Sequence, residues 1–106
     1  MQRVDMVLTG ANASTPWKNA DWMVKPFQLS IAVIASGGTA AFTVQYTYDD
    51  LMAGAPPAAN VFNDATLNNA TATGETTVND PITGWRVTTG AGNSATLTIR
   101  AIQATF

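Results

Sequence analysis

Apolar and polar residues alternate along two adjoining stretches of this chain, residues 26–36 and 39–49. A period of two places every second side chain on the same face of a β-strand, so each stretch has an apolar face and a small, polar face. Gly37 and Gly38 separate the stretches, and glycine readily adopts the positive φ angles of tight hairpin turns. The pattern therefore predicts a β-hairpin with one buried face and a nearly uncharged outer face. The apolar positions are Phe27, Leu29, Ile31, Val33, Phe42, Val44, Tyr46 and Tyr48.

The same alternation predicts three further strands, at residues 2–8, 82–88 and 94–103. Their inward positions are Val4, Met6, Leu8, Trp85, Val87, Ala95, Leu97, Ile99 and Ala101. Weaker patterns predict a short strand at 22–24, weak strands or extended segments at 61–67 and 70–78, and loops at 9–20 and 51–59. The second loop contains two adjacent prolines, which cannot serve in a central strand because proline lacks the N–H donor.

No stretch shows a convincing helical period, and several short strands alternate with turn residues. This arrangement predicts an all-β protein, an antiparallel β-sandwich (jelly-roll-like) of about six to eight strands. A length of 106 residues allows one domain, residues 1–106. The predicted core between the sheets consists of Phe27, Leu29, Ile31, Val33, Phe42, Val44, Tyr46, Trp85, Val87, Leu97 and Ile99.

The amino-acid composition limits the kinds of catalytic and binding site that this chain can form. The chain has no cysteine and no histidine, so it lacks thiolate sites and the commonest general base and metal ligand. Only 11% of residues are charged, against roughly a quarter in an average domain. Five basic residues are too few and too scattered to follow a phosphate backbone, so no nucleic-acid partner is expected. Arg86 and Arg100 are expected on outer faces.

The acidic residues suggest neither catalysis nor metal binding. Asp49 and Asp50 are neighbours, and adjacent residues of a strand point to opposite faces, which suits a pair of catalytic carboxylates poorly. Asp49, Asp50 and Asp64 could donate oxygens to calcium, but their spacing does not match an EF-hand. The chain is therefore not expected to be an enzyme or to hold a metal or cofactor.

Two loops carry side chains that suit contact with another protein. Tryptophan buries a wide surface at low entropic cost and is enriched at interfaces. The predicted interface residues, all in or beside these loops, are Trp17, Trp22, Met52, Pro56 and Pro57. Sparse charge is also unusual for a free monomer, because net charge keeps monomers apart.

Several stretches resemble small β-rich virion proteins of tailed bacteriophages. They are the Pro-Phe start of residues 26–31, the sequence TVQYTYDD at 43–50, the Arg-bearing strand after Pro81 and the closing strand 95–104, in this order. The resemblance covers most of the chain from Trp22 onward and departs in detail at 52–78. It implies a structural component of the particle, a head decoration or cement protein on the capsid surface. The implied partner is the major capsid protein or another virion protein.

The resemblance also implies a cyclic homo-oligomer, a trimer in preference to a dimer. Neither the first ten residues nor any later run is apolar over the length of a signal peptide or membrane span, so no membrane partner is expected. Assembly in the bacterial host cytoplasm is expected instead. Two alternatives remain: a neck, tail or fibre-associated virion protein, and a carbohydrate-binding β-sandwich that uses Trp17 and Trp22.

Overall fold

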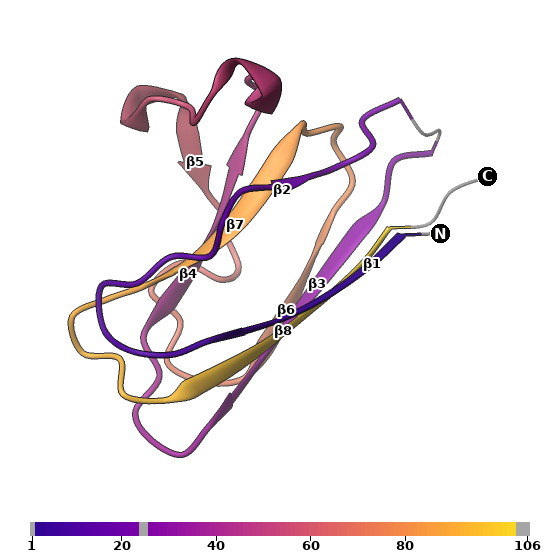
Figure 1. The fold of residues 1–106 in the computed structure, drawn as a ribbon. Coiled ribbons are helices and arrows are strands. Elements are labelled where there is room, and N and C mark those ends of the chain that lie inside the picture. The colour runs from indigo at the N-terminus through magenta and orange to yellow at the C-terminus, as the bar shows by residue number, and fades with distance from the viewer. Residues whose placement is uncertain (1, 24–25, 104–106) are drawn as a thin grey trace.

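Two four-stranded sheets face each other in the computed structural model, which describes residues 2–23 and 26–103 (Figure 1). The strands are β1 (Gln2–Leu8), β2 (Lys18–Asn19), β3 (Leu29–Ser36), β4 (Phe42–Thr47), β5 (Val61–Asn63), β6 (Gly74–Val78), β7 (Gly84–Thr89) and β8 (Thr96–Gln103). Two single-turn 3-10 helices, η1 (Leu51–Ala53) and η2 (Ala58–Asn60), lie between β4 and β5. No helix in the described ranges is long and apolar enough to cross a membrane.

The strand order is that of a jelly roll. One sheet has the order β1-β8-β3-β6 and the other β2-β7-β4-β5, with antiparallel neighbours throughout. Strand β1 pairs with β8, β2 with β7, β3 with β6 and β4 with β5, so the two halves of the chain form one long antiparallel ribbon. Rolling that ribbon up produces the two packed sheets. The predicted all-β antiparallel sandwich is confirmed, with eight strands.

The predicted hairpin across Gly37 and Gly38 is wrong. Strand β3 pairs with β6 and β8, whereas β4 pairs with β5 and β7 in the opposite sheet. Both strands turn their apolar faces toward the same interior, and the chain crosses from one sheet to the other between them. Gly37 does adopt a positive φ of 72°. Gly38 allows a close approach instead, since a Cβ there would lie 2.6 Å from the backbone oxygen of Ser94.

Several predicted boundaries shift as well. Trp22 and Met23 lie in a turn and not in a strand, and Val24 is outside the described residues. Strand β2 forms earlier, inside the predicted loop 9–20, because Lys18 and Asn19 pair with β7. The segments predicted at 61–67 and 70–78 contain only the short strands β5 and β6.

The predicted core is confirmed apart from Tyr46, which is half-buried and packs against the core edge. Tyr48, predicted on the same apolar face, is exposed. Thr43 and Thr47, predicted on the outer face of β4, are buried instead. Their hydroxyls explain this placement, because the Thr43 Oγ1 accepts from the Asn69 N–H and the Thr47 Oγ1 donates to the Asn60 carbonyl. The long connections beside β5 therefore cover the outer face of β4.

No segment within residues 2–23 and 26–103 packs over the outer face of the β1-β8-β3-β6 sheet, here called the broad outer face. Its three large exposed apolar side chains are Val7, Ile34 and Ile102. Asp5 lies between two guanidinium groups, 3.2 Å from the Arg3 Nε and 4.0 Å from the Arg100 Nε. Such exposed ion pairs contribute little to stability. Their relevance is that the charges on this face balance locally.

A candidate interaction site at one end of the sandwich

Three connections gather at the same end of the sandwich. They are the β2–β3 loop, the β4–β5 connection that carries η1 and η2, and the β6–β7 loop, which lie in the upper part of Figure 1. The alternating strand directions of a jelly roll bring every second connection to the same end. Segments near residues 20, 50 and 80 therefore meet, although they are far apart in sequence.

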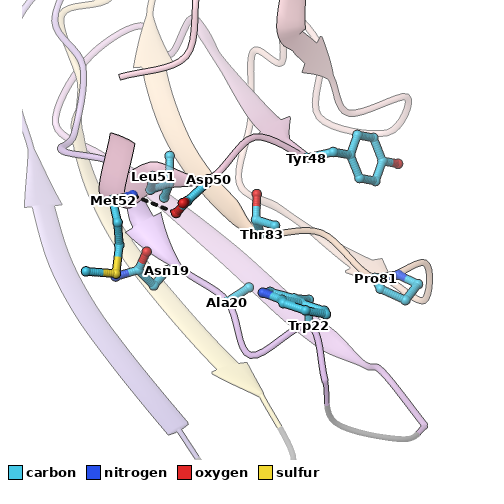
Figure 2. A pocket seen from close by; sticks show the side chains of 9 residues that line it. All are labelled: Asn19, Ala20, Trp22, Tyr48, Asp50, Leu51, Met52, Pro81 and Thr83. Atoms are coloured by element: carbon cyan, nitrogen blue, oxygen red, sulfur yellow. Dashed lines mark hydrogen bonds between the residues drawn. The ribbon is translucent and has the colours of Figure 1, made fainter. Parts of the chain in front are cut away.

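A hollow with a volume of about 770 Å³ opens between these connections (Figure 2). We call it the end groove. Its apolar lining comes from Ala20, Trp22, Tyr48, Leu51, Met52 and Pro81. Its polar lining comes from Asn19, Asp50 and Thr83. This volume is typical of sites that hold a ligand or a cluster of partner side chains.

Exposed aromatic and methionine side chains surround the end groove. The Met52 side chain is 93% exposed, and Trp22 and Tyr48 are about half exposed. The Tyr48 ring also makes an edge-to-face contact with Phe62, with ring centroids 5.7 Å apart. Met23, next to Trp22, is exposed too. Five of the eight large exposed apolar side chains in the described chain therefore lie in or beside this groove.

The β2–β3 loop is held by a buried glutamine. Gln103, at 2% exposure, accepts a hydrogen bond from the Asp21 N–H (2.9 Å) through its Oε1 and donates to the Asp21 carbonyl (2.7 Å) through its Nε2. The Asp21 carboxylate in turn accepts from the Met23 N–H (3.2 Å). Trp22 thus lies between two anchored residues, so its backbone is positioned without a regular strand.

The β4–β5 connection is anchored where it passes the groove. The Asp50 Oδ1 caps η1 by accepting from the Met52 N–H (2.9 Å), as Figure 2 shows. The Thr83 hydroxyl donates to the carbonyls of Thr47 and Asp49. Leu51 packs directly on Gly84, where any Cβ would collide with the leucine side chain. The groove wall is therefore attached to the end of β7.

The predicted interface residues are only partly brought together. Trp22 and Met52 line the end groove, and Trp17 lines a smaller adjoining hollow of about 270 Å³ that also includes Met52. Pro56 and Pro57 line neither hollow. Their role at an interface stays a prediction.

Sequence reasoning missed Tyr48, Leu51, Pro81, Met23 and Phe62 as members of this end. Tyr48 follows the alternation of the buried face, which misled the prediction. The sequence signal that could have identified Tyr48 is the Asp49-Asp50 pair that follows it. Aspartate commonly begins a turn, so the pair indicates that the strand ends near Tyr48 and leaves its side chain uncovered.

A row of polar contacts crosses the outer face of the β2-β7-β4-β5 sheet. The Arg86 guanidinium lies 4.7 Å from the Trp17 ring centroid, a cation–π arrangement. The Arg86 Nε donates to the Gln45 Oε1 (2.9 Å), and the Gln45 Nε2 donates to the Asn63 Oδ1 (3.0 Å). Partial burial lowers the pKa of Arg86 from its usual value. Arg86 is engaged within the chain, while Arg100 lies exposed on the broad outer face.

Asp64 is a buried carboxyl group, 8% exposed, that organises the β5–β6 connection. Its Oδ1 accepts from the hydroxyls of Tyr46 and Thr76, and its Oδ2 accepts from the backbone N–H groups of Thr66 and Leu67. Four protein donors therefore occupy its two oxygens, so Asp64 serves a structural role. In residues 2–23 and 26–103, no three acidic side chains gather around a common point.

The contact with Asp64 has a consequence at high pH. Burial raises the pKa of the Tyr46 phenol well above its usual value near 10, and the Asp64 carboxyl group adds to the effect. The folded state therefore retains the Tyr46 proton at a pH where the unfolded chain loses it. The contribution of this group to stability is constant below about pH 10 and decreases as pH rises above that value.

We expect the Tyr46→Phe variant to lose part of this alkaline sensitivity, because phenylalanine has no proton to release. Urea melts at a series of pH values from about 8 to 11 measure the effect. Tyr48→Phe is the matched control, since Tyr48 is exposed and forms no such bond. Parallel pH profiles for wild type and Tyr46→Phe would contradict the assignment.

Comparison of the sequence with models of known protein families and with curated proteins finds no match. The candidate site therefore rests on its own geometry.

Proposed function

We propose that this chain is a structural virion protein of a tailed bacteriophage, a capsid decoration or cement protein that binds the assembled head. The observation that supports this proposal is the end groove with the exposed side chains in and beside it, which are Trp22, Met23, Tyr48, Met52 and Phe62. Contiguous apolar surface of this kind marks a site of interaction with another molecule. The resemblance to phage virion proteins supplies the identity of the partner, the major capsid protein or another virion protein.

The mechanism is adhesive and needs no catalytic group. A protein that binds the assembled shell and not its free subunits stabilises the shell by mass action. Many identical copies on one lattice add multivalency, so a weak individual contact suffices. The virion surface is the proposed location, after assembly in the bacterial cytoplasm.

The test is binding to heads of the phage that encodes this chain, purified from a strain in which its gene is deleted. We expect the purified protein to cosediment with these heads and to raise their melting temperature. Trp22→Ala, in the groove rim, is expected to weaken cosedimentation, whereas Asn68→Ala, in an exposed loop of the β5–β6 connection, is not. Binding to tails or necks and not to heads would favour the alternative virion role. Binding to no phage part would contradict the proposal.

We further propose that copies of the chain associate through the broad outer face, with a trimer favoured over a dimer. Val7, Ile34 and Ile102 provide the apolar contact, and Arg3, Arg100, Asp5 and Glu75 balance one another in charge. Another copy can therefore contact this face without net repulsion.

The Ile102→Lys variant is expected to reduce the oligomer to monomers and keep the fold, since it places a charge among the exposed apolar side chains of that face. Light scattering coupled to size-exclusion chromatography gives the mass, and circular dichroism checks the fold. Asn68→Lys, with the same added charge away from this face, is the control. A monomeric wild-type protein at all concentrations tested would contradict this interface.

A further inference from the structure

We propose that the end groove binds an extended peptide segment in which an arginine or lysine is flanked by apolar residues. That the segment belongs to a virion protein rests on the function proposed above. The chemistry of the segment is inferred from the groove itself.

The groove offers aromatic and flexible apolar contacts. Trp22 and Tyr48 belong to two different connections and both line the hollow, with Asp50 and Thr83 also in its lining (Figure 2). Met52 is almost completely exposed beside them. Methionine is polarizable and adaptable, and it is overused on surfaces that accept varied apolar side chains. The volume of about 770 Å³ accommodates several partner side chains and not merely one.

The charge of this end favours a cation. The described residues of the three connections include four carboxylates, Asp21, Asp49, Asp50 and Asp80, and no basic side chain. Lys25 belongs to the β2–β3 loop but lies outside the described residues. Asp50 lines the groove directly, and only its Oδ1 is used by the cap on Met52. The same acidic charge disfavours the matching end of a second copy as the occupant.

A guanidinium or ammonium group suits the aromatic walls as well as the carboxylates. Cations bind over the faces of tryptophan and tyrosine, and arginine does so most often. This chain already forms one such pair, because Arg86 lies over the ring of Trp17, a residue that lines the adjoining hollow. An arginine entering the end groove would meet a comparable combination of an aromatic face and a polar oxygen.

An oligosaccharide fits this lining less well. Each sugar hydroxyl needs a hydrogen-bond partner when it leaves water. The Thr83 hydroxyl is used by the carbonyls of Thr47 and Asp49, and one Asp50 oxygen is used by η1. Six of the nine lining residues are apolar or aromatic. The groove therefore favours a peptide with apolar side chains over a polyhydroxylated ring.

The test uses three capped pentapeptides that differ only in the middle residue, Ala-Leu-Arg-Leu-Ala and its Gln and Glu counterparts. They are titrated into the isotopically labelled protein, and NMR chemical shifts are followed. We expect the Arg peptide to shift the Trp22 indole and Met52 methyl signals, with a dissociation constant on the order of 1 mM. The Glu peptide is expected to leave both unchanged. Binding of the Arg peptide should weaken as salt rises from about 50 to 500 mM.

Two variants examine the groove residues separately. Asp50→Asn keeps the side-chain oxygen that caps η1 and removes the charge, so it is expected to weaken Arg-peptide binding about three- to fivefold without loss of fold. Trp22→Ala is expected to abolish the Met52 shifts. Glu75→Gln, on the broad outer face, is the control and should bind as the wild type does.

Each other outcome contradicts the proposal. The proposal is overturned if the Arg and Glu peptides bind equally, if no peptide binds, or if the shifts are confined to another surface. It is also overturned if a neutral oligosaccharide, titrated in the same way, binds more tightly than the Arg peptide. Head cosedimentation separates this inference from the proposed function. If Trp22→Ala and Asp50→Asn bind heads as the wild type does, the decoration role stands and the assignment of the groove's segment to a virion protein falls. If the Arg peptide binds but heads do not, the groove assignment stands and the decoration role falls.

Discussion

Replacing Ile31 with alanine is expected to lower the free energy of unfolding by roughly 2 to 5 kcal/mol. Ile31 is 0% exposed and is the third residue of β3, where it pairs with Ala101 of β8 and Thr76 of β6. Its side chain points into the space between the sheets. Truncation removes apolar contacts and leaves a cavity that rigid neighbouring strands cannot fill. For a small domain with a total stability of about 5 to 15 kcal/mol, this is a large fraction.

Urea denaturation measures the effect, and β3 supplies its own control. Ile34 lies in the same strand, points outward and is 40% exposed, so Ile34→Ala is expected to cost well under half as much. Both variants delete the same atoms from the same strand. Equal losses at the two positions would mean that the burial of Ile31 does not contribute as the packing indicates.

Replacing Asp64 with alanine is expected to destabilise the protein by roughly 3 to 5 kcal/mol. The substitution leaves two hydroxyls and two backbone N–H groups without their acceptor. The hydrogen bonds that Asp64 accepts from the Leu67 N–H and the Thr76 hydroxyl are buried. Water therefore cannot readily replace the lost carboxyl group as their acceptor.

The design for Asp64 separates the hydrogen bonds from the charge. Asp64→Asn keeps one acceptor oxygen and is expected to lose less stability than Asp64→Ala, while Asp80→Ala, at an exposed aspartate, should change stability by less than about 0.5 kcal/mol. Thermal and urea melts give the values. An Asp64→Ala variant as stable as Asp80→Ala would contradict a structural role for the buried carboxyl group.

The sequence by itself determined the part of the core that the long strands contribute. Alternation with period two identified the inward faces of β1, β3, β7 and β8, because burial of one face of a strand selects apolar residues at every second position. The all-β class followed from the same local pattern, and the turn residues between short strands favoured an antiparallel arrangement. These features depend on neighbours in the chain, so the sequence records them directly.

The pairing of β3 with β6 and β8, and the end groove, depended on the tertiary structure. Alternation states which face of a strand is buried but not which strand lies beside it, so a hairpin at Gly37-Gly38 and a crossing between sheets have the same pattern. Asp64, which accepts four buried or partly buried hydrogen bonds, and Gln103, which holds the β2–β3 loop, resembled ordinary polar residues in the sequence. Trp22, Tyr48 and Met52 become one site only because rolling up the antiparallel ribbon brings three distant connections to one end of the sandwich.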